Sequence, residues 1–417
     1  MRTVAIVGAL DTKGEENQYL KGLLEKMGVK TLLIDVGILH APSVCPDIPA
    51  ECVAQAMGTD LMALRAKGDR SECLTCMGNG AGKLVRSLCD QGKVHGVISI
   101  GGGQGTLMGA HVMRQLPLGF PKLLLSTIAL LKDSDVPFRG IRDTMVMNSQ
   151  VDVSGLNSVM KLMLQKSAAA LVGMVNMAFD SPVCNSKLCI GMTMFGITTP
   201  CVTRARELLE ERGYEVLVFH ATGTGGPTME SLISEGRIHG VADITLAEIT
   251  HQLFGGSGAA GDDRLLTAGR YGIPQVVVPG ALDCINFMPP ESMPERFQGR
   301  KYHMHNENLK VVRTSCEENG ILGRVIAQRL NRSKGDVEVL LPTLGLSAND
   351  CPNGGDFRDD KADEELFREL QTHLSPGISC RRLEYHINDP KFAEIIVETL
   401  DRLMRQRYGI CDYVSSD

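Results

Sequence analysis

The sequence predicts an α/β protein made of two Rossmann-like, doubly wound parallel-sheet subdomains that are related by an internal repeat. Three observations support this fold class. Short apolar runs alternate with segments suited to helices, stretches of the two halves match in the same order, and glycine-rich turns follow several of the apolar runs. Strands of a parallel sheet are covered by helices on both faces, so they appear as continuous apolar runs.

The first half supplies one such layer. Its predicted elements are the strand "VAIVGA", a helix over 14–27, the strand "KTLLID", a helix near 82–91, the strand "GVISIG", a helix near 105–115 and the strand "KLLLST". Right-handed strand–helix–strand crossovers place these helices on both faces of one parallel sheet.

The second half follows the same plan. Its predicted elements are the strand "KLCIGMTMFG", a helix over 202–212, the strand "EVLVFH", a helix over 227–235, the strand "GVADI", a helix near 262–271 and the strand "QVVVPG". Apolar residues then recur with helical spacing over 392–404. We expect this last helix to pack on a domain or on a second subunit.

The internal repeat is visible in three pairs of segments. They are 23–35 with 208–220, 85–100 with 229–244, and 119–127 with 272–280. The members of the first pair lie further apart than those of the second, which predicts an insertion around 36–72 in the first half. A polar break near 180–187 separates the halves and predicts an N-terminal subdomain over 1–183 and a C-terminal subdomain over 184–417.

Composition argues against several classes of protein. The chain has a net charge of −6, whereas a nucleic-acid-binding protein normally has an excess of Lys and Arg over Asp and Glu. No run reaches the roughly 18 apolar residues of a membrane span, and the apolar N-terminal run is short for a signal peptide. The thirteen cysteines include one C-x-x-C pair, Cys73 and Cys76, without a second pair for a four-sulfur zinc site. We expect a cytoplasmic protein that binds neither nucleic acid nor membrane.

A glycine-rich loop after "GVISIG" is the first candidate site. It comprises Gly101, Gly102, Gly103, Gln104, Gly105 and Thr106. Exposed amides at the start of a helix form an anion site, which predicts that the loop holds phosphate or carboxylate. The loop departs from G-x-G-x-x-G, and Leu84 occupies the place of the Ser or Thr of a Walker motif in "GNGAGKL". A packing or turn role is the alternative for each loop.

Charged and hydroxyl residues follow the neighbouring strands. Lys13 can neutralise phosphate or lie in solvent, and Asp11 can orient Lys13, hold a metal or cap a helix. Asp35 ends the second strand, where an acid can bind ribose hydroxyls or simply form a turn. Ser126 and Thr127 end the strand "KLLLST" at the same predicted edge.

The second half carries a similar loop and a group of histidines. Gly223, Thr224, Gly225 and Gly226 follow the strand that ends at His220, and we expect this loop and the first one to meet in one cleft between the halves.

Asp283 ends another strand, and His303 and His305 share one face of an extended segment. Together with His220 they can act as acid–base groups or hold a metal of unknown identity, or they can be hydrogen-bonded histidines in a seam between the domains.

The stretches "VAIVGALDTKGEE", "SIGGGQGT", "FHATGTGG" and "GIPQVVVPGALD" resemble those of the ATP-binding family typified by the N-terminal region of the tomato tobamovirus-resistance protein. The resemblance covers nearly all of 1–410 and implies two Rossmann-like subdomains, ATP binding and a homodimer. It implies ligand contacts at Asp11, Thr12, Lys13, the 101–106 loop and the "FHATGTGG" loop. The plant protein's antiviral activity and its additional C-terminal barrel, which resembles phosphoenolpyruvate hydrolases, are not carried over.

Three hypotheses follow. The first is a protein that binds ATP, with or without Mg²⁺, by its phosphates on Gly101–Thr106 near Lys13. The second is an enzyme that acts on a small carboxylate or a phosphorylated sugar acid through its histidines and Asp283. The third is a non-catalytic sensor whose two lobes close on a small anionic ligand.

Overall fold

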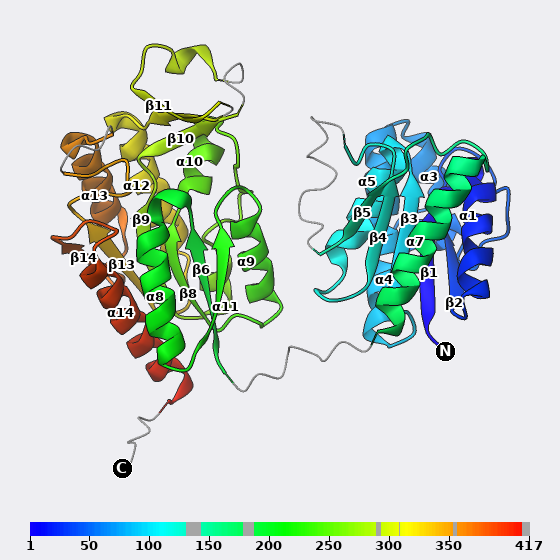
Figure 1. The fold of residues 1–417 in the computed structure, drawn as a ribbon, viewed down its shortest axis with the longest axis horizontal. Coiled ribbons are helices and arrows are strands. Elements are labelled where there is room, and N and C mark those ends of the chain that lie inside the picture. Colours follow the sequence, from blue (N-terminus) through cyan, green and yellow to red (C-terminus); the bar gives the residue numbers. More distant parts are fainter. Residues whose placement is uncertain (131–142, 178–186, 289–292, 308, 353–356, 411–417) are drawn as a thin grey trace. The chain divides into compact units, whose positions relative to one another are not determined.

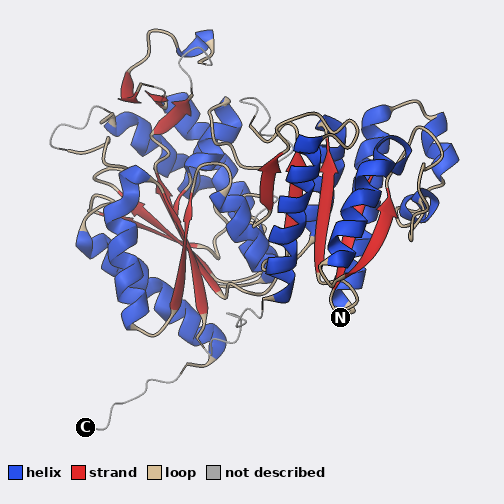
Figure 2. Cartoon of the chain, turned by 45° about the vertical axis from the view of Figure 1, so that its right-hand side comes forward, coloured by secondary structure: helices blue, strands red, loops and turns tan. Residues whose placement is uncertain are grey.

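The computed structural model describes residues 1–130, 143–177, 187–288, 293–307, 309–352 and 357–410 (Figure 1). The chain divides into two compact units, Met1–Ser181 and Pro182–Asp417. The sequence-based division between 183 and 184 lies outside the described residues. Each unit is an α/β layer structure with a parallel sheet between helices (Figure 2), so the predicted fold class is confirmed.

The sheet of the N-terminal unit has five parallel strands in the order β2-β1-β3-β4-β5. They are β1 (Thr3–Gly8), β2 (Lys30–Asp35), β3 (Gly96–Gly101), β4 (Lys122–Ser126) and β5 (Met145–Asn148). This is the 2-1-3-4-5 order of flavodoxin-like sheets, in which chain order reverses between the first and third strands.

Helices bury both faces of this sheet. One face is covered by α1 (Leu10–Lys26) and α7 (Ser158–Asn176), and the other by α2 (Ala50–Gln55), α3 (Leu61–Ala66), α4 (Arg70–Asp90) and α5 (Gly103–Gln115). Successive residues of β1 alternate between the two cores, since Ala5 and Val7 face one and Val4 and Ile6 face the other. The predicted insertion at 36–72 contains α2 and α3.

Among the described residues, α7 is long and apolar enough to cross a membrane by length and composition alone, a test that core helices also pass. Its Leu164 and Leu171 are fully buried in the N-terminal core.

Helix α4 begins earlier than its apolar pattern predicts, because Asp69 caps it by accepting hydrogen bonds from the amides of Ser71 and Glu72. The stretch "GNGAGKL" therefore lies inside α4, where its glycines permit close packing. A Cβ at Gly80 would lie 2.3 Å from the carbonyl oxygen of Val53 on α2.

The sheet of the C-terminal unit has six parallel strands in the order β14-β13-β9-β8-β6-β7. They are β6 (Cys189–Met194), β7 (Glu215–His220), β8 (Gly240–Thr245), β9 (Gln275–Gly280), β13 (Val337–Pro342) and β14 (Ser379–Leu383). From β7 onward, this sheet repeats the order of the first one, with β6 and β8 in the places of β1 and β3. The matched sequence segments occupy equivalent positions in the two sheets.

Helices also cover both faces of the second sheet. One face carries α8 (Thr199–Glu211) and α14 (Pro390–Tyr408). The other carries α9 (Gly225–Ser234), α10 (Ala247–Phe254), α11 (Thr267–Tyr271), α12 (Cys316–Leu330) and α13 (Asp360–His373). The predicted helix over 392–404 is α14, and it packs within its own unit.

A small antiparallel sheet that the sequence did not predict lies in the same unit. Its order is β10-β12-β11, formed by β10 (Cys284–Phe287), β11 (Tyr302–Asn306) and β12 (Leu309–Arg313). Two short 3₁₀ turns, η1 (Gly196–Thr198) and η3 (Glu295–Phe297), complete the elements used below.

Gly80→Ala should destabilise the N-terminal unit by about 1–3 kcal/mol, because the added methyl group collides with backbone on α2. Gly173→Ala is the matched control, since a Cβ there meets nothing within 4 Å and alanine favours a helix. Urea denaturation measures both. Equal midpoints for the two variants would contradict the close packing of α2 on α4.

Candidate functional site

A cavity of about 340 Å³ opens beyond the carboxyl ends of β1 and β3 in the N-terminal unit. Its walls include residues 9 and 11–13 after β1 and Gly101–Gly105 at the end of β3 and the start of α5. Helices α1 and α5 leave these strands on opposite faces of the sheet, so the loops diverge and leave space between them. Crevices at such reversals are the usual ligand sites of open α/β sheets.

The first turn of α5 points its amides at this cavity. Gly102 is the N-cap residue, and no side chain caps the helix. The positive end of the helix dipole is therefore available to a ligand. A Cβ at Gly103 would meet nothing within 4 Å, whereas a Cβ at Gly101 would lie 2.7 Å from the Cα of Gly105. Gly101 is required by the tight turn, and Gly103 leaves the approach to the amides open.

Two cationic side chains line the same cavity. Lys13 interrupts the helical geometry of α1 (φ −131°, ψ 27°), and its Nζ donates a hydrogen bond to the carbonyl of Val153. Arg70, the first residue of α4, donates from Nη2 to Oε1 of Gln104 at 2.7 Å. Both cations are thus anchored at the rim by neutral acceptors, which leaves their charge uncompensated by those contacts.

Two carboxylates complete the cavity wall, Asp11 and Asp152. Oδ2 of Asp11 accepts a hydrogen bond from the amide of Leu39 at 2.8 Å. Its buried Oδ1 has no hydrogen-bond partner within the described ranges. A buried acceptor without a partner is uncommon in folded proteins, so Oδ1 of Asp11 is a candidate contact point for a ligand group or a cation.

The other residues predicted for this site do not line the cavity but hold its loops in place through hydrogen bonds. Asp35 is buried, and its Oδ1 accepts hydrogen bonds from the amides of Leu10 and Gly37 at 3.0 and 2.8 Å. Burial raises the pKa of this carboxyl above its ordinary value, although the two amides oppose that shift. Asp35 ties the end of β2 to the start of α1 and does not line the cavity.

Thr106 and Ser126 are also buried. Their hydroxyl oxygens lie 2.7 Å apart and join α5 to the end of β4. The amide of Thr127 donates to the carbonyl of Gly101 at 3.2 Å. These three residues fix the position of the glycine loop rather than line the 340 Å³ cavity.

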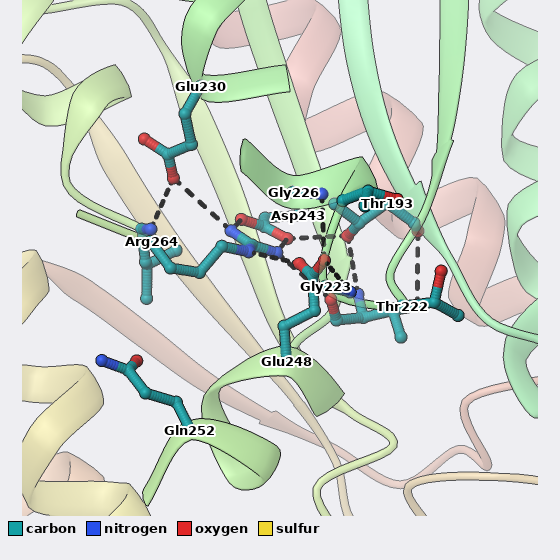
Figure 3. Close-up of polar contacts among 12 residues, drawn as sticks. Thr193, Thr222, Gly223, Gly226, Glu230, Asp243, Glu248, Gln252 and Arg264 are labelled. Carbon is teal, nitrogen blue, oxygen red and sulfur yellow. Dashed lines mark hydrogen bonds and ion pairs between the residues drawn. The ribbon is translucent and has the colours of Figure 1, made fainter. Parts of the chain in front are cut away.

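The glycine loop of the C-terminal unit already holds an anion from its own chain. The amides of Gly223 and Gly226 donate to Oε1 of Glu248 at 2.8 and 3.1 Å (Figure 3). A Cβ at Gly226 would lie 2.0 Å from the Glu248 carboxylate. The sequence predicts that this loop receives a ligand anion, but the structure fills the loop with Glu248.

Glu248 is held in turn by Arg264, which is fully buried and surrounded by acids. Arg264 donates from Nε to Glu248 at 2.9 Å and from Nη2 to Asp243 at 2.7 Å, and Glu230 lies 3.6 Å away (Figure 3). Burial opposes the charged form, but the three carboxylates raise the pKa of Arg264 above its ordinary value. Ion pairs and hydrogen bonds to the carboxylates thus explain how Arg264 stays charged in the protein interior.

A second cavity, of about 290 Å³, lies in the C-terminal unit. It opens where β6 gives way to η1 and where β7 ends, and β10 and β12 of the small sheet also contribute to its wall. His220 lines it, with its ring centroid 5.6 Å from that of Phe195. His251 on α10 lines it from inside, and burial lowers the pKa of this imidazole to about 4.

The predicted acid–base residues do not all lie at this cavity. Of the three whose side chains the structure describes, His220 lines it, whereas Asp283 and His303 do not. Asp283 is fully buried and accepts a hydrogen bond from Oγ of Ser347 at 2.7 Å. His303 lies on β11 opposite Val311, and the side chain of His305 lies outside the described residues. Thr224 and Gly225 begin α9 beside the Glu248-filled loop.

Within the described part of the chain, no group of three or more His, Cys, Asp or Glu side chains is arranged to hold a metal ion. Sequence reasoning missed two cavity-lining residues, namely Arg70 at the start of α4 and His251, which lies in an apolar helix segment and resembles an ordinary core residue. Burial and the absence of a hydrogen-bond partner single out His251, and neither can be read from the sequence.

Two family models match the chain. Residues 2–180 match the N-terminal domain and residues 187–404 the C-terminal domain of the "Uncharacterised protein family (UPF0261)". A UPF0261 protein of Clostridium tetani is 39% identical over 97% of this chain and 100% of its own length. Another, from Rhizobium meliloti, is 41% identical over 95% of this chain and 98% of its own.

A tomato protein is also similar. The "ToMV resistance protein Tm-1(GCR237)" of Solanum lycopersicum is 36% identical over 99% of this chain but only 57% of its own length. Among solved structures, the Staphylococcus aureus MnaA–UDP complex aligns over 99% of this chain and 98% of its own at 11% identity and a TM-score of 0.22. So low a score supports no functional argument.

Glu248→Gln should destabilise the C-terminal unit by about 3 kcal/mol, because it removes a carboxylate from a buried arginine. Glu207→Gln is the matched control, since Glu207 forms only an exposed 3.9 Å ion pair with Arg204 and should cost under about 1 kcal/mol. Guanidinium denaturation compares the two. A small effect at Glu248 would contradict the tight coupling of the loop to Arg264.

His251 should make the folded state acid-sensitive. Its folded pKa of about 4 lies below the unfolded value of about 6.5, so the unfolded chain takes up a proton first as pH falls. Stability should be lost between about pH 6.5 and pH 4, by about 3 kcal/mol in total. His251→Phe should remove this part of the slope in denaturation measured across that range. Identical slopes in the two proteins would show that His251 is not buried in neutral form.

Proposed function

The chain belongs to the uncharacterised protein family UPF0261, and we propose that its N-terminal unit binds a nucleotide, ATP, through phosphates seated on the first turn of α5. One observation carries this proposal. An uncapped helix start, bare of side chains at Gly102 and Gly103, opens into the cavity at the reversal of strand order.

Helix geometry supplies the main attraction. The first amides of a helix have no carbonyl partner within it, and the dipole adds about half a positive charge there. A phosphate can approach these amides closely only where side chains are absent. The open space over Gly103 meets that requirement.

The cations of the rim add specificity for a multiply charged ligand. Lys13 and Arg70 come from different helices and both line the cavity. Each is bound to a neutral oxygen in the structure, so a phosphate can exchange with a carbonyl or an amide acceptor without breaking an ion pair. Hydrogen bonds between charged partners are stronger than the neutral-acceptor contacts that they replace.

Asp11 gives the site a second kind of contact. Its buried Oδ1 can accept from a ribose hydroxyl or bind a Mg²⁺ ion that accompanies the phosphates. The homodimer, the cytoplasmic location and the cleft shared by both glycine loops stay predictions.

Isothermal titration calorimetry should show saturable binding of ATP that weakens stepwise through ADP to adenosine. Lys13→Ala should weaken ATP roughly tenfold to a hundredfold, as expected for loss of a charged hydrogen bond, and leave adenosine unchanged.

The matched pair Gly103→Glu and Gly22→Glu isolates the cavity. Both positions have open space for a side chain, but only Gly103 lines the site. Gly103→Glu should abolish ATP binding and Gly22→Glu should not. Binding of 3-phosphoglycerate in place of ATP, blocked by the same variant, would favour the sugar-acid enzyme hypothesis. Nucleotide binding that survives Gly103→Glu would reject the proposed site.

A further inference from the structure

Two buried polar side chains line the cavity of the C-terminal unit and carry atoms that have no hydrogen-bond partner of good geometry among the described residues. His251 is 1% exposed and Asn286 is 5% exposed, and both line the cavity. Neither ring nitrogen of His251 has a partner of good geometry, although the backbone of Gly258 lies close to the ring. Oδ1 of Asn286 likewise has no partner among the described residues.

Such groups are costly in a folded protein. A buried amide or imidazole gives up its hydrogen bonds to water, and folded proteins normally replace them. Here the replacements are missing on two elements, α10 and β10, that face one space. Because both side chains line the same cavity, a ligand bound there lies beside both groups.

The cavity has no charged wall. None of its described lining residues is Lys, Arg, Asp or Glu, and apolar side chains such as Ile197, Leu309 and Val311 make up much of the wall. The neighbouring glycine loop cannot attract a phosphate, because Glu248 fills it. A ligand of this cavity is therefore uncharged.

The polar contacts also define the shape of the ligand. The side-chain amide of Asn286 presents an acceptor beside a donor, and this pair matches the N6 and N7 edge of adenine. Neutral His251 supplies one donor and one acceptor. The rings of Phe195 and His220, tilted at 49° to each other, add flat surfaces to the wall.

We propose that this cavity binds an uncharged, planar nitrogen heterocycle of the adenine type, recognised by Asn286 and His251. The site is separate from the phosphate site of the N-terminal unit. It rests on different residues, so either can fail without the other.

Adenine itself is the probe, and ligand-detected NMR and calorimetry on the full chain measure its binding. Purine, which lacks the amino group, should bind at least tenfold more weakly, since it leaves Oδ1 of Asn286 unpaired. Asn286→Leu should lower adenine affinity at least tenfold while the melting temperature stays equal or rises. A purely structural asparagine would lose stability instead.

A second pair of variants guards against misfolding of Asn286→Leu. Gly196 lines the cavity and has open space for a side chain, so Gly196→Trp should block adenine. Gly261→Trp, at an equally open position away from the lining residues, should not.

The variant Gly103→Glu distinguishes the proposed heterocycle site of the C-terminal unit from the proposed ATP site of the N-terminal unit. Adenine binding that persists in Gly103→Glu and is lost in Gly196→Trp supports the proposal. Absence of saturable adenine binding overturns it, and so does binding that is lost in Gly103→Glu but unchanged in Gly196→Trp. Absence of adenine binding does not test whether ATP phosphates bind at α5, whereas loss in Gly103→Glu alone would assign adenine to the N-terminal cavity.

Discussion

The reversal of strand order next to the first strand of each sheet is the constraint on which both cavities depend. Right-handed crossovers send the helices after β1 and β3 to opposite faces, and the same happens after β6 and β8. The loops at these strand ends cannot pack on each other, so each sheet has a crevice at its carboxyl edge. The side chains and amides of those loops therefore determine which ligands the crevices can bind.

The two units carry their cavities and glycine loops after different strands, since the loops follow β3 and β7 and the cavities lie at the ends of β1 and β3 and of β6 and β7. In the N-terminal unit, the first turn of α5 is uncapped, and Lys13 and Arg70 stand beside it. In the C-terminal unit, the loop before α9 is closed by Glu248, and the open space lies instead among apolar side chains around His251. One unit is suited to negative charge and the other to an uncharged ring. An internal repeat of fold does not by itself predict a repeat of function.

Sequence patterns predicted the fold well because they report on burial. Continuous apolar runs marked the strands of the parallel sheets as far as β9 except the partly exposed β5, which was missed, and the matched segments were found in equivalent places. The small sheet of β10, β11 and β12 was missed, since its short antiparallel strands carry residues such as Asn286 and His303 that resemble a functional loop.

Cavity residues that directly follow a predicted strand could be predicted from the sequence. Cavity residues that come from distant parts of the chain were missed. Lys13 and the glycines of α5 follow their strands directly. Asp35 was predicted to bind ribose hydroxyls or to form a turn, and its carboxylate turns inward to the amides of Leu10 and Gly37. The direction of a strand-end side chain depends on its partners in space, as does the missing partner of His251. A single sequence shows neither the direction of such a side chain nor its hydrogen-bond partners.

The contrast between the two glycine loops shows why a loop motif needs its partners before it indicates function. By composition, "TGTGG" is as good an anion loop as "GGGQG". Its amides, however, belong to a network in which Glu248 neutralises Arg264, which is completely buried. A phosphate could enter only by displacing Glu248, at the cost of its hydrogen bonds to the amides of Gly223 and Gly226 and of its ion pair with Arg264, which would keep Asp243 and Glu230 as partners. That cost closes the second loop to anions, whereas the start of α5 meets no such competitor among the described residues.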